Sequence, residues 1–172
     1  KIFRLFGTNS VENSARLCHS SSVYAMSEML GTGAMTNTVA EIKNAEAIFV
    51  IGSDAEESHP VVSYEIKRRK LSGGKLVVID AVKTGLAKKA DLFLNLRSGT
   101  DVALFNGMMN VIISENIYDK DFTAKNLEGL EELKKIVKNY PPAVVEKVTG
   151  VPAEKIIAAA RIYAKAESVM CF

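Results

Sequence analysis

The chain has 172 residues, of which 48% are hydrophobic and 24% charged, a composition close to the average of globular domains. It therefore excludes a disordered chain, and because no apolar run reaches roughly 18 residues it predicts no membrane-spanning segment. A formal net charge of +2 gives no reason to expect nucleic acid as a partner, and two cysteines do not make a disulfide framework.

The first part of the chain contains two unusual polar stretches. Residues 15–26 read "ARLCHSSSVYAM" and place Cys18 directly beside His19. Residues 30–37 read "LGTGAMTN" and predict a glycine-rich turn, which the helix predicted over 38–45 follows.

Residues 46 to 96 predict a strand–helix–strand arrangement. The apolar run 46–52 is typical of a buried strand, and 58–74 predicts a helix with Pro60 in its first turn. Two further apolar runs, 75–80 and 90–96, predict the second and third strands. Such a succession is the βαβ unit of a parallel sheet.

The second half predicts mainly helices, because its apolar residues recur at helical spacing. The predicted helices are 101–117, 127–140, 141–150 and 152–167, followed by a strand at 168–172. The fold class expected is α/β, with a doubly wound, mainly parallel sheet and helices on both faces, forming a single domain over 1–172.

Ligands bind such sheets beyond the carboxyl ends of the strands, so the loops 52–60 and 80–85 are the expected binding loops. Asp80 closes a strand, where an acidic residue bonds a ribose hydroxyl or a nucleobase; a helix cap or a turn residue facing solvent is an equal alternative. Ser58 is the expected N-cap of the next helix, and His59 is expected to be a structural hydrogen-bonding residue rather than a catalyst.

The glycine-rich turn offers backbone N–H groups to a phosphate or another anion through Gly31 and Gly33. Two glycines in a loop are more often only a turn. The spacing matches neither the dinucleotide fingerprint nor the P-loop, so a plain NAD or ATP site is not indicated.

Three interpretations of Cys18 and His19 remain open from their chemistry. They can form a nucleophile and base, although adjacent residues of an extended chain point to opposite faces. The thiolate can be a soft metal ligand while the imidazole reaches a substrate. The third interpretation is a buried thiol without chemistry.

The order of motifs resembles one family. The stretches "GTNSVENSARLCHSSS", "GTGAMTNTVAEIKNAEAIFVIGSDAEESHPV" and "KLVVIDAVKTGLAKKADLFLNLRSGTDVALFNGMMNVIISENIYDKDF" closely resemble the molybdopterin oxidoreductases, and within them the catalytic alpha subunit of formate dehydrogenase. The resemblance runs from residue 1 to 172 and covers roughly a quarter of the family's chain. It implies that this chain is an internal fragment carrying the family's Rossmann-like domain.

The resemblance implies a molybdenum or tungsten centre that carries two molybdopterin guanine dinucleotides and oxidises formate to carbon dioxide. Cys18 then ligates the metal, and His19 assists the removal of hydrogen from formate. Electrons leave through a [4Fe–4S] cluster whose ligands are not in this chain. The residues that the resemblance assigns to cofactor binding are Gly31, Gly33, Asp54, Glu57, Ser58, Asp80 and Asp101.

The implied partners are formate, the rest of the alpha subunit and an iron–sulfur or electron-transfer subunit. The opening "KIFRLFGTNS" is not typical of a signal peptide, so a cytoplasmic location is expected. Two departures concern the nucleotide site. Ala81 and Val82 follow Asp80 where relatives continue with Pro-Arg, which removes a cationic donor, and Asp54 stands where relatives usually have asparagine.

The family's cysteine-rich cluster segment and a later active-site arginine lie outside this sequence, so the isolated chain is expected to be catalytically inactive. Two alternatives accompany the formate interpretation. One is another molybdopterin oxidoreductase, similar to nitrate reductase. The other is a non-catalytic nucleotide-binding or assembly domain.

Overall fold

The chain forms two compact units in the computed structural model, which describes residues 1–172. The first unit is Lys1–Thr38 and the second is Val39–Phe172. All four strands belong to the second unit, which is therefore the α/β domain. The single domain over 1–172 stays a prediction.

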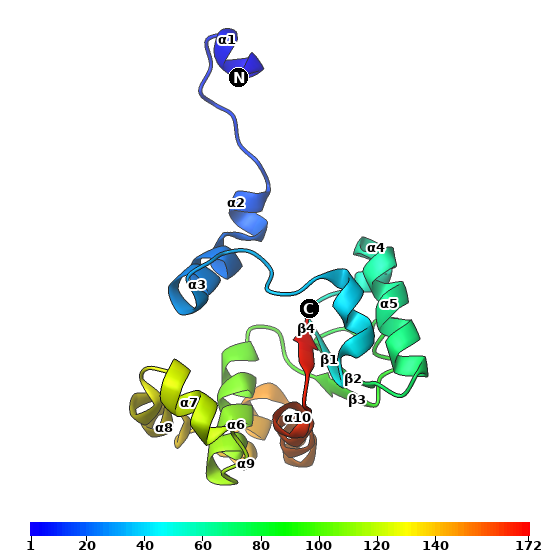
Figure 1. Ribbon diagram of the computed structural model, residues 1–172, viewed down its shortest axis with the longest axis vertical. Coiled ribbons are helices and arrows are strands. Elements are labelled where there is room, and N and C mark those ends of the chain that lie inside the picture. The colour runs from blue at the N-terminus through cyan, green and yellow to red at the C-terminus, as the bar shows by residue number, and fades with distance from the viewer. The chain divides into compact units, whose positions relative to one another are not determined.

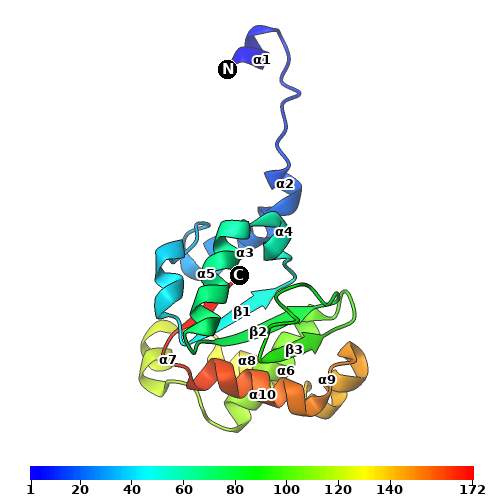
Figure 2. The ribbon, with the colours of Figure 1, turned by 90° about the vertical axis from the view of Figure 1, so that its right-hand side faces the viewer.

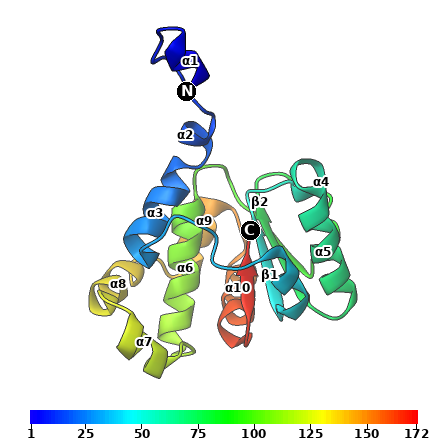
Figure 3. The ribbon, with the colours of Figure 1, turned by 45° about the horizontal axis from the view of Figure 1, so that its top comes forward.

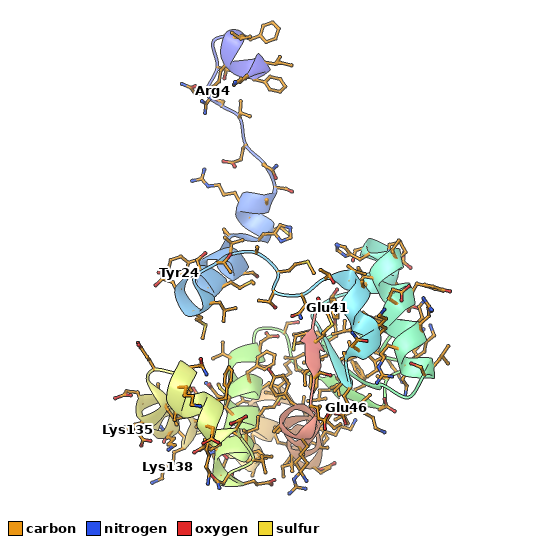
Figure 4. The ribbon with its side chains drawn as sticks, in the orientation of Figure 1. Arg4, Tyr24, Glu41, Glu46, Lys135 and Lys138 are labelled. Atoms are coloured by element: carbon orange, nitrogen blue, oxygen red, sulfur yellow. The ribbon has the colours of Figure 1, made fainter.

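The first unit consists of three helices and their connections. They are α1 (Ile2–Leu5), α2 (Ala15–Cys18) and α3 (Ser20–Leu30). None of the residues of this unit is buried. Figure 4 shows the side chains of these helices projecting outward from the ribbon, with Arg4 labelled on α1 and Tyr24 on α3. The first unit thus has no hydrophobic core of its own.

The second unit begins with a 3₁₀ helix and then combines strands with α-helices (Figure 1). In chain order its elements are η1 (Val39–Asn44), β1 (Ala47–Ile51), α4 (Ala55–Ser58), α5 (Pro60–Leu71), β2 (Lys75–Asp80), β3 (Leu92–Asn95), α6 (Asp101–Ser114), α7 (Lys120–Asn126), α8 (Leu130–Val137), α9 (Pro142–Thr149), α10 (Ala153–Lys165) and β4 (Val169–Cys171). None of the chain's helices is long and apolar enough to cross a membrane.

The sheet has four parallel strands in the order β3-β2-β1-β4. Ala47 of β1 lies opposite Lys75 of β2 on one side and opposite Val169 of β4 on the other. The connection from β1 leads outward to β2 and β3, and the chain then returns through α6–α10 to place β4 on the other side of β1. The four predicted strands and their parallel arrangement are confirmed.

Helices cover both faces of the sheet, as predicted for a doubly wound fold. Figure 2 shows α5 on one side of β1–β3 and α10 on the other, and Figure 3 shows α6 and α10 on the side away from α5. Because side chains alternate along a strand, the two faces bury different residues. Phe49 and Val77 pack with α6, α9 and α10, whereas Ile48 and Leu76 pack with η1, α4 and α5.

The helix predicted over 58–74 is α5, which spans Pro60–Leu71, and the short helix α4 before it was not predicted. α4 ends at Ser58, His59 adopts φ −139° and ψ 62°, and α5 begins at Pro60. A residue before proline is pushed out of the helical region by the proline ring, so His59 separates α4 from α5. The helix α4 thus lies within the predicted binding loop 52–60, after the carboxyl end of β1.

Two other helical segments differ from their predictions. Residues Val39–Asn44 form a 3₁₀ helix rather than an α-helix. The helix α7 was not predicted; it begins after Asp119, whose Oδ1 accepts a hydrogen bond from the N–H of Phe122 at 2.8 Å. The helix predicted over 101–117 ends at Ser114, before Asn116 with its positive φ of 55°.

Candidate functional site

Cys18 and His19 lie at the junction of two helices in the first unit. Cys18 is the last residue of α2, and His19 precedes the first residue of α3. The N–H of His19 donates to the carbonyl oxygen of Ala15 at 2.8 Å, so the backbone here is helical. Adjacent side chains point to opposite faces only in an extended chain, so this restriction does not apply to Cys18 and His19.

Both side chains are accessible. Cys18 is a free, exposed cysteine and His19 is exposed as well. An exposed thiol contradicts the interpretation of Cys18 as a buried, inert sulfur. Since no group of three or more His, Cys, Asp and Glu side chains is assembled to hold a metal, Cys18 is a single donor.

The two glycines of the glycine-rich turn each have a structural role. Gly31 ends α3 with φ +77°, and its N–H donates to the carbonyl oxygen of Ser27 at 3.1 Å. At Gly33 an added Cβ would lie 2.7 Å from Cγ1 of Val23, so a side chain has no room. These roles account for both glycines within the first unit, and their assignment to a cofactor stays a prediction.

Three predicted nucleotide-binding residues follow the carboxyl end of β1. Asp54 directly precedes α4, which carries Glu57 and ends with Ser58, and all three are exposed. Ser58 does not cap α5 as predicted, since its Oγ donates to the carbonyl oxygen of Asp54 at 2.9 Å. The same Oγ lies 2.9 Å from Nδ1 of His59, which is the hydrogen bond expected of a structural histidine.

Asp80 ends β2 in a tightly held turn. Its Oδ1 accepts from the N–H of Val82 at 2.7 Å. Nδ2 of Asn95, the last residue of β3, donates to the carbonyl oxygens of Asp80 at 3.0 Å and Ala81 at 2.8 Å. The turn after β2 is therefore fixed by its own aspartate and by the neighbouring strand. Asn95 was not singled out from the sequence, although a polar residue within the apolar strand predicted over 90–96 was the available signal.

Asp101 is the first residue of α6 and is exposed. It follows Thr100, whose Oγ1 donates to the carbonyl oxygen of Arg97 at 2.6 Å. A carboxylate in the first turn also stabilises the helix through its dipole, so Asp101 has a structural role besides the predicted one.

Glu56 connects the loops after β1 and β2. Its Oε1 accepts from Nζ of Lys67 and from Nζ of Lys89, each at 2.8 Å. The hydrogen bond from Lys67 and then that from Lys89 lower the pKa of this carboxyl below the ordinary glutamate value. Sequence reasoning missed Glu56, because nothing in "DAEES" distinguishes it from its acidic neighbours.

The family model of the molybdopterin oxidoreductases matches residues 2–171. The chain belongs to this family. Among curated molybdopterin relatives, the F420-dependent formate dehydrogenase subunit alpha of Methanocaldococcus jannaschii is 46% identical over 93% of this chain. Formate dehydrogenase H of Escherichia coli is 44% identical over 95% of it. The resemblance inferred from the order of motifs is therefore confirmed.

The structure of acetylene hydratase from Pelobacter acetylenicus matches with a TM-score of 0.83 and 32% identity over 97% of this chain. This likeness confirms the predicted α/β fold of the molybdopterin oxidoreductases. The chain spans about a quarter of its relatives, namely 24% and 23% of the two formate dehydrogenase chains and 23% of the hydratase.

Membership of the family implies a molybdenum or tungsten molybdopterin cofactor. The donor set of this chain fits such a group. A thiolate is a soft ligand that suits a sulfur-rich centre, and the exposed Cys18 supplies one, so the other donors would come from the cofactor itself. Hydrogen-bond acceptors for a nucleotide are present at the carboxyl edge of the sheet in the side chains of Asp54, Glu57 and Asp80.

Proposed function

We propose that the chain is a fragment of a formate dehydrogenase alpha subunit, which oxidises formate to carbon dioxide at a molybdenum or tungsten centre carrying two molybdopterin guanine dinucleotides. The observation that carries the proposal is the 41–46% identity over 93–95% of the chain with three formate dehydrogenase chains. The fold alone does not select this reaction, because a protein named as a hydratase shares it.

Cys18 and His19 have distinct roles in this proposal. The bound metal supplies the two-electron redox chemistry. Cys18 holds the metal through its thiolate sulfur, for which its exposure at the end of α2 is suited. His19 accepts or positions a proton of the substrate, a role for which an imidazole is suited near neutral pH.

The guanine dinucleotides are assigned to the carboxyl edge of the sheet and to the glycine-rich turn. The proposed binding residues are Asp54, Glu57, Ser58, Asp80 and Asp101 in the second unit and Gly31 and Gly33 in the first. Binding beyond the carboxyl ends of parallel strands is the general rule for open α/β sheets. Carboxylates there can accept hydrogen bonds from guanine N–H groups, which would distinguish guanine from adenine.

The proposal extends to the longer protein. A [4Fe–4S] cluster with ligands outside these 172 residues would accept the electrons, and an iron–sulfur or electron-transfer subunit in the cytoplasm would receive them. Because the chain spans only about a quarter of its relatives, the isolated 172 residues are expected to show no formate oxidation. Measurable turnover by the isolated chain would contradict this.

The test is metal analysis and activity of the intact protein carrying this chain, purified without oxygen. Formate oxidation and nitrate reduction are measured separately. Replacing Cys18 by alanine should remove formate turnover, and His19→Ala should lower it by about a hundredfold or more, the usual contribution of a proton-transfer residue. Cys171→Ala is the matched control, since Cys171 lies in β4 of the second unit. Nitrate reduction without formate oxidation would assign the chain to the nitrate alternative.

One observation favours a second candidate, a nucleotide-binding domain without catalysis. Val82 is 67% exposed in the turn after Asp80, where an apolar side chain offers nothing to a phosphate. Guanine nucleotide binding should then be weak in the intact protein and strengthened by Val82→Arg. Full cofactor loading together with formate oxidation by the wild-type protein would exclude this candidate.

A further inference from the structure

Glu56 is held by two lysines from different parts of the chain. The first, Lys67, lies on α5, two turns after its start, and the second, Lys89, lies beyond β2. Both ammonium groups donate to the same oxygen, Oε1, at 2.8 Å. The Glu56 side chain is only 20% exposed, so these pairs are better shielded from solvent than ordinary surface ion pairs.

The second oxygen of Glu56 lies against Gly85. A Cβ added to Gly85 would stand 1.5 Å from Oε2, an impossible distance, so this space belongs to the carboxylate. Gly85 is not among the glycines with positive φ, and its backbone would therefore tolerate a side chain. The glycine is required here by the presence of Glu56 and not by the turn.

The segment around Gly85 is otherwise well packed. Thr84, Leu86 and Ala87 are buried, and Leu86 and Ala87 belong to the same core as Ala55 of α4. The carboxylate of Glu56 thus lies at a point where α4, α5 and the segment 84–89 meet. Its neighbours in sequence, Asp54, Glu57 and Ser58, are the proposed nucleotide-binding residues after β1.

We infer that Glu56 is a positioning residue that fixes the spacing between the loops after β1 and β2, and thereby shapes the guanine dinucleotide site between them. This inference rests on the proposed function for its ligand. Glu56 contributes no contact to the nucleotide in this account, because Oε1 is occupied by two lysines and Oε2 faces Gly85.

The experiment compares variants of the intact protein carrying this chain. Glu56→Gln keeps the shape of the side chain and removes its charge. Glu65→Gln is the matched control, since Glu65 also pairs with a basic residue of α5, Arg68, but touches neither loop. Two measurements are made: hydrogen exchange of the amides in 52–58 and 80–89, and the rate at which bound guanine dinucleotide is released.

Glu56→Gln should raise exchange in both loops and speed guanine dinucleotide release by up to about fivefold, the effect expected from losing the charge of a partly exposed ion pair. Glu65→Gln should change neither quantity. Gly107→Ala, which crowds Val145 of α9 on the opposite face of the sheet, should lower stability without touching the loops. It should leave release unchanged, which separates positioning from a general loss of stability.

Gly85→Ala provides a second test. Alone, it should loosen both loops, because its Cβ displaces the carboxylate. In a Glu56→Ala background the same change should have no further effect, since the space is then empty. Additive effects of the two substitutions would overturn the inference.

The two proposals fail in different ways. If the wild-type protein contains no guanine dinucleotide, the proposed function is wrong, and loop exchange alone decides the role of Glu56. If the wild-type protein is loaded and Glu56→Gln releases the dinucleotide at the wild-type rate, the inference is wrong and the proposed function stands.

Discussion

The two cysteines of the chain lie in contrasting surroundings. Cys18 is an exposed, free thiol at the end of α2. Cys171 is also accessible, yet it lines an apolar cavity of about 340 Å³ with Phe49, Phe105 and Tyr163, and partial burial raises the pKa of its thiol. Since the thiolate is the nucleophile, the chemistry of the two sulfurs should differ.

Alkylation should therefore modify Cys18 severalfold faster than Cys171 in the native chain at neutral pH. Iodoacetamide labelling followed by peptide mass analysis measures both rates. Cys18→Ser should remove the fast phase, and unfolding in urea should make the two rates similar. Equal alkylation rates of Cys18 and Cys171 in the native chain would show that partial burial does not reduce the reactivity of the Cys171 thiol.

The stabilisation provided by Glu56 should depend on pH. Lys67 and then Lys89 lower the pKa of its carboxyl in the folded chain. The ionised group thus stabilises the fold at pH values above the ordinary glutamate pKa, and this contribution is lost as the pH falls through the lowered value. Glu56→Gln should cost at most about 1 kcal/mol at neutral pH, as partly exposed ion pairs do.

Urea unfolding at about pH 7 and about pH 4, on either side of the ordinary glutamate pKa, measures this dependence. The difference between wild type and Glu56→Gln should narrow at the lower pH. A difference that widens on acidification would show that the carboxylate is not stabilised by its lysines.

At the residue scale, the sequence identifies candidate site residues when reactive side chains are rare and adjacent. One of two cysteines beside one of two histidines is unusual in any chain, so Cys18 and His19 were singled out. Glu56 was not identified from the sequence, because its role depends on Lys67 and Lys89, which are 11 and 33 residues away. Local sequence carries no information about such tertiary partners.

The contact between α6 and α9 depends on a glycine within a helix. A Cβ at Gly107 would lie 2.9 Å from Cγ2 of the buried Val145, a stiff side chain that cannot move aside. Gly107→Ala should therefore destabilise the fold by about 1 kcal/mol, since overpacking outweighs the gain in helix propensity.

Chemical denaturation of Gly107→Ala checks this expectation. Val145→Ala in the same chain should partly rescue the variant by opening the space that the new methyl group needs. If Gly107→Ala alone increased the free energy of unfolding, α6 and α9 would be able to move apart without a loss of stability.

The helix α7 depends on a single N-cap. Asp119 accepts from the N–H of Phe122 at 2.8 Å, and its replacement by alanine should cost about 1 kcal/mol. Hydrogen exchange within Lys120–Asn126 should increase while the strands stay protected. Asp119→Asn should retain most of the protection, because an amide oxygen also accepts this hydrogen bond; loss of protection in the strands as well would mean that α7 and the sheet unfold together.

At the element scale, the buried strands and the long helices were predicted because their apolar periodicity is strong. The short helix α4 was not predicted, because four residues are too few to show a helical period. The helix α7 has few apolar residues to show a period, so its capping aspartate was the only local signal.

For the whole molecule, the two units should differ greatly in protection. The unit Lys1–Thr38 has no buried residue, whereas four residues in each of the strands β1 and β2 of Val39–Phe172 are buried. Limited proteolysis of the isolated chain should therefore cut first within 1–38 and leave a stable fragment beginning near Val39. First cleavage within the sheet would contradict this division.

The fold class and the family were predictable because they follow from the order of several long motifs. The division into two units was not, since the family match runs over residues 2–171 as one stretch and marks no boundary at Val39. Sequence similarity records an ancestry shared along the whole chain, whereas a hydrophobic core requires apolar residues that meet in space. Only the second unit provides them.

The strand β4 has a hydrogen-bonding neighbour on one side only, because it pairs with β1 alone. On its other side, the backbone N–H and C=O groups have no neighbouring strand and can form hydrogen bonds with an extended segment of another chain. The 172-residue polypeptide should consequently become more prone to self-association as its concentration rises, and purification at low protein concentration should favour the monomer.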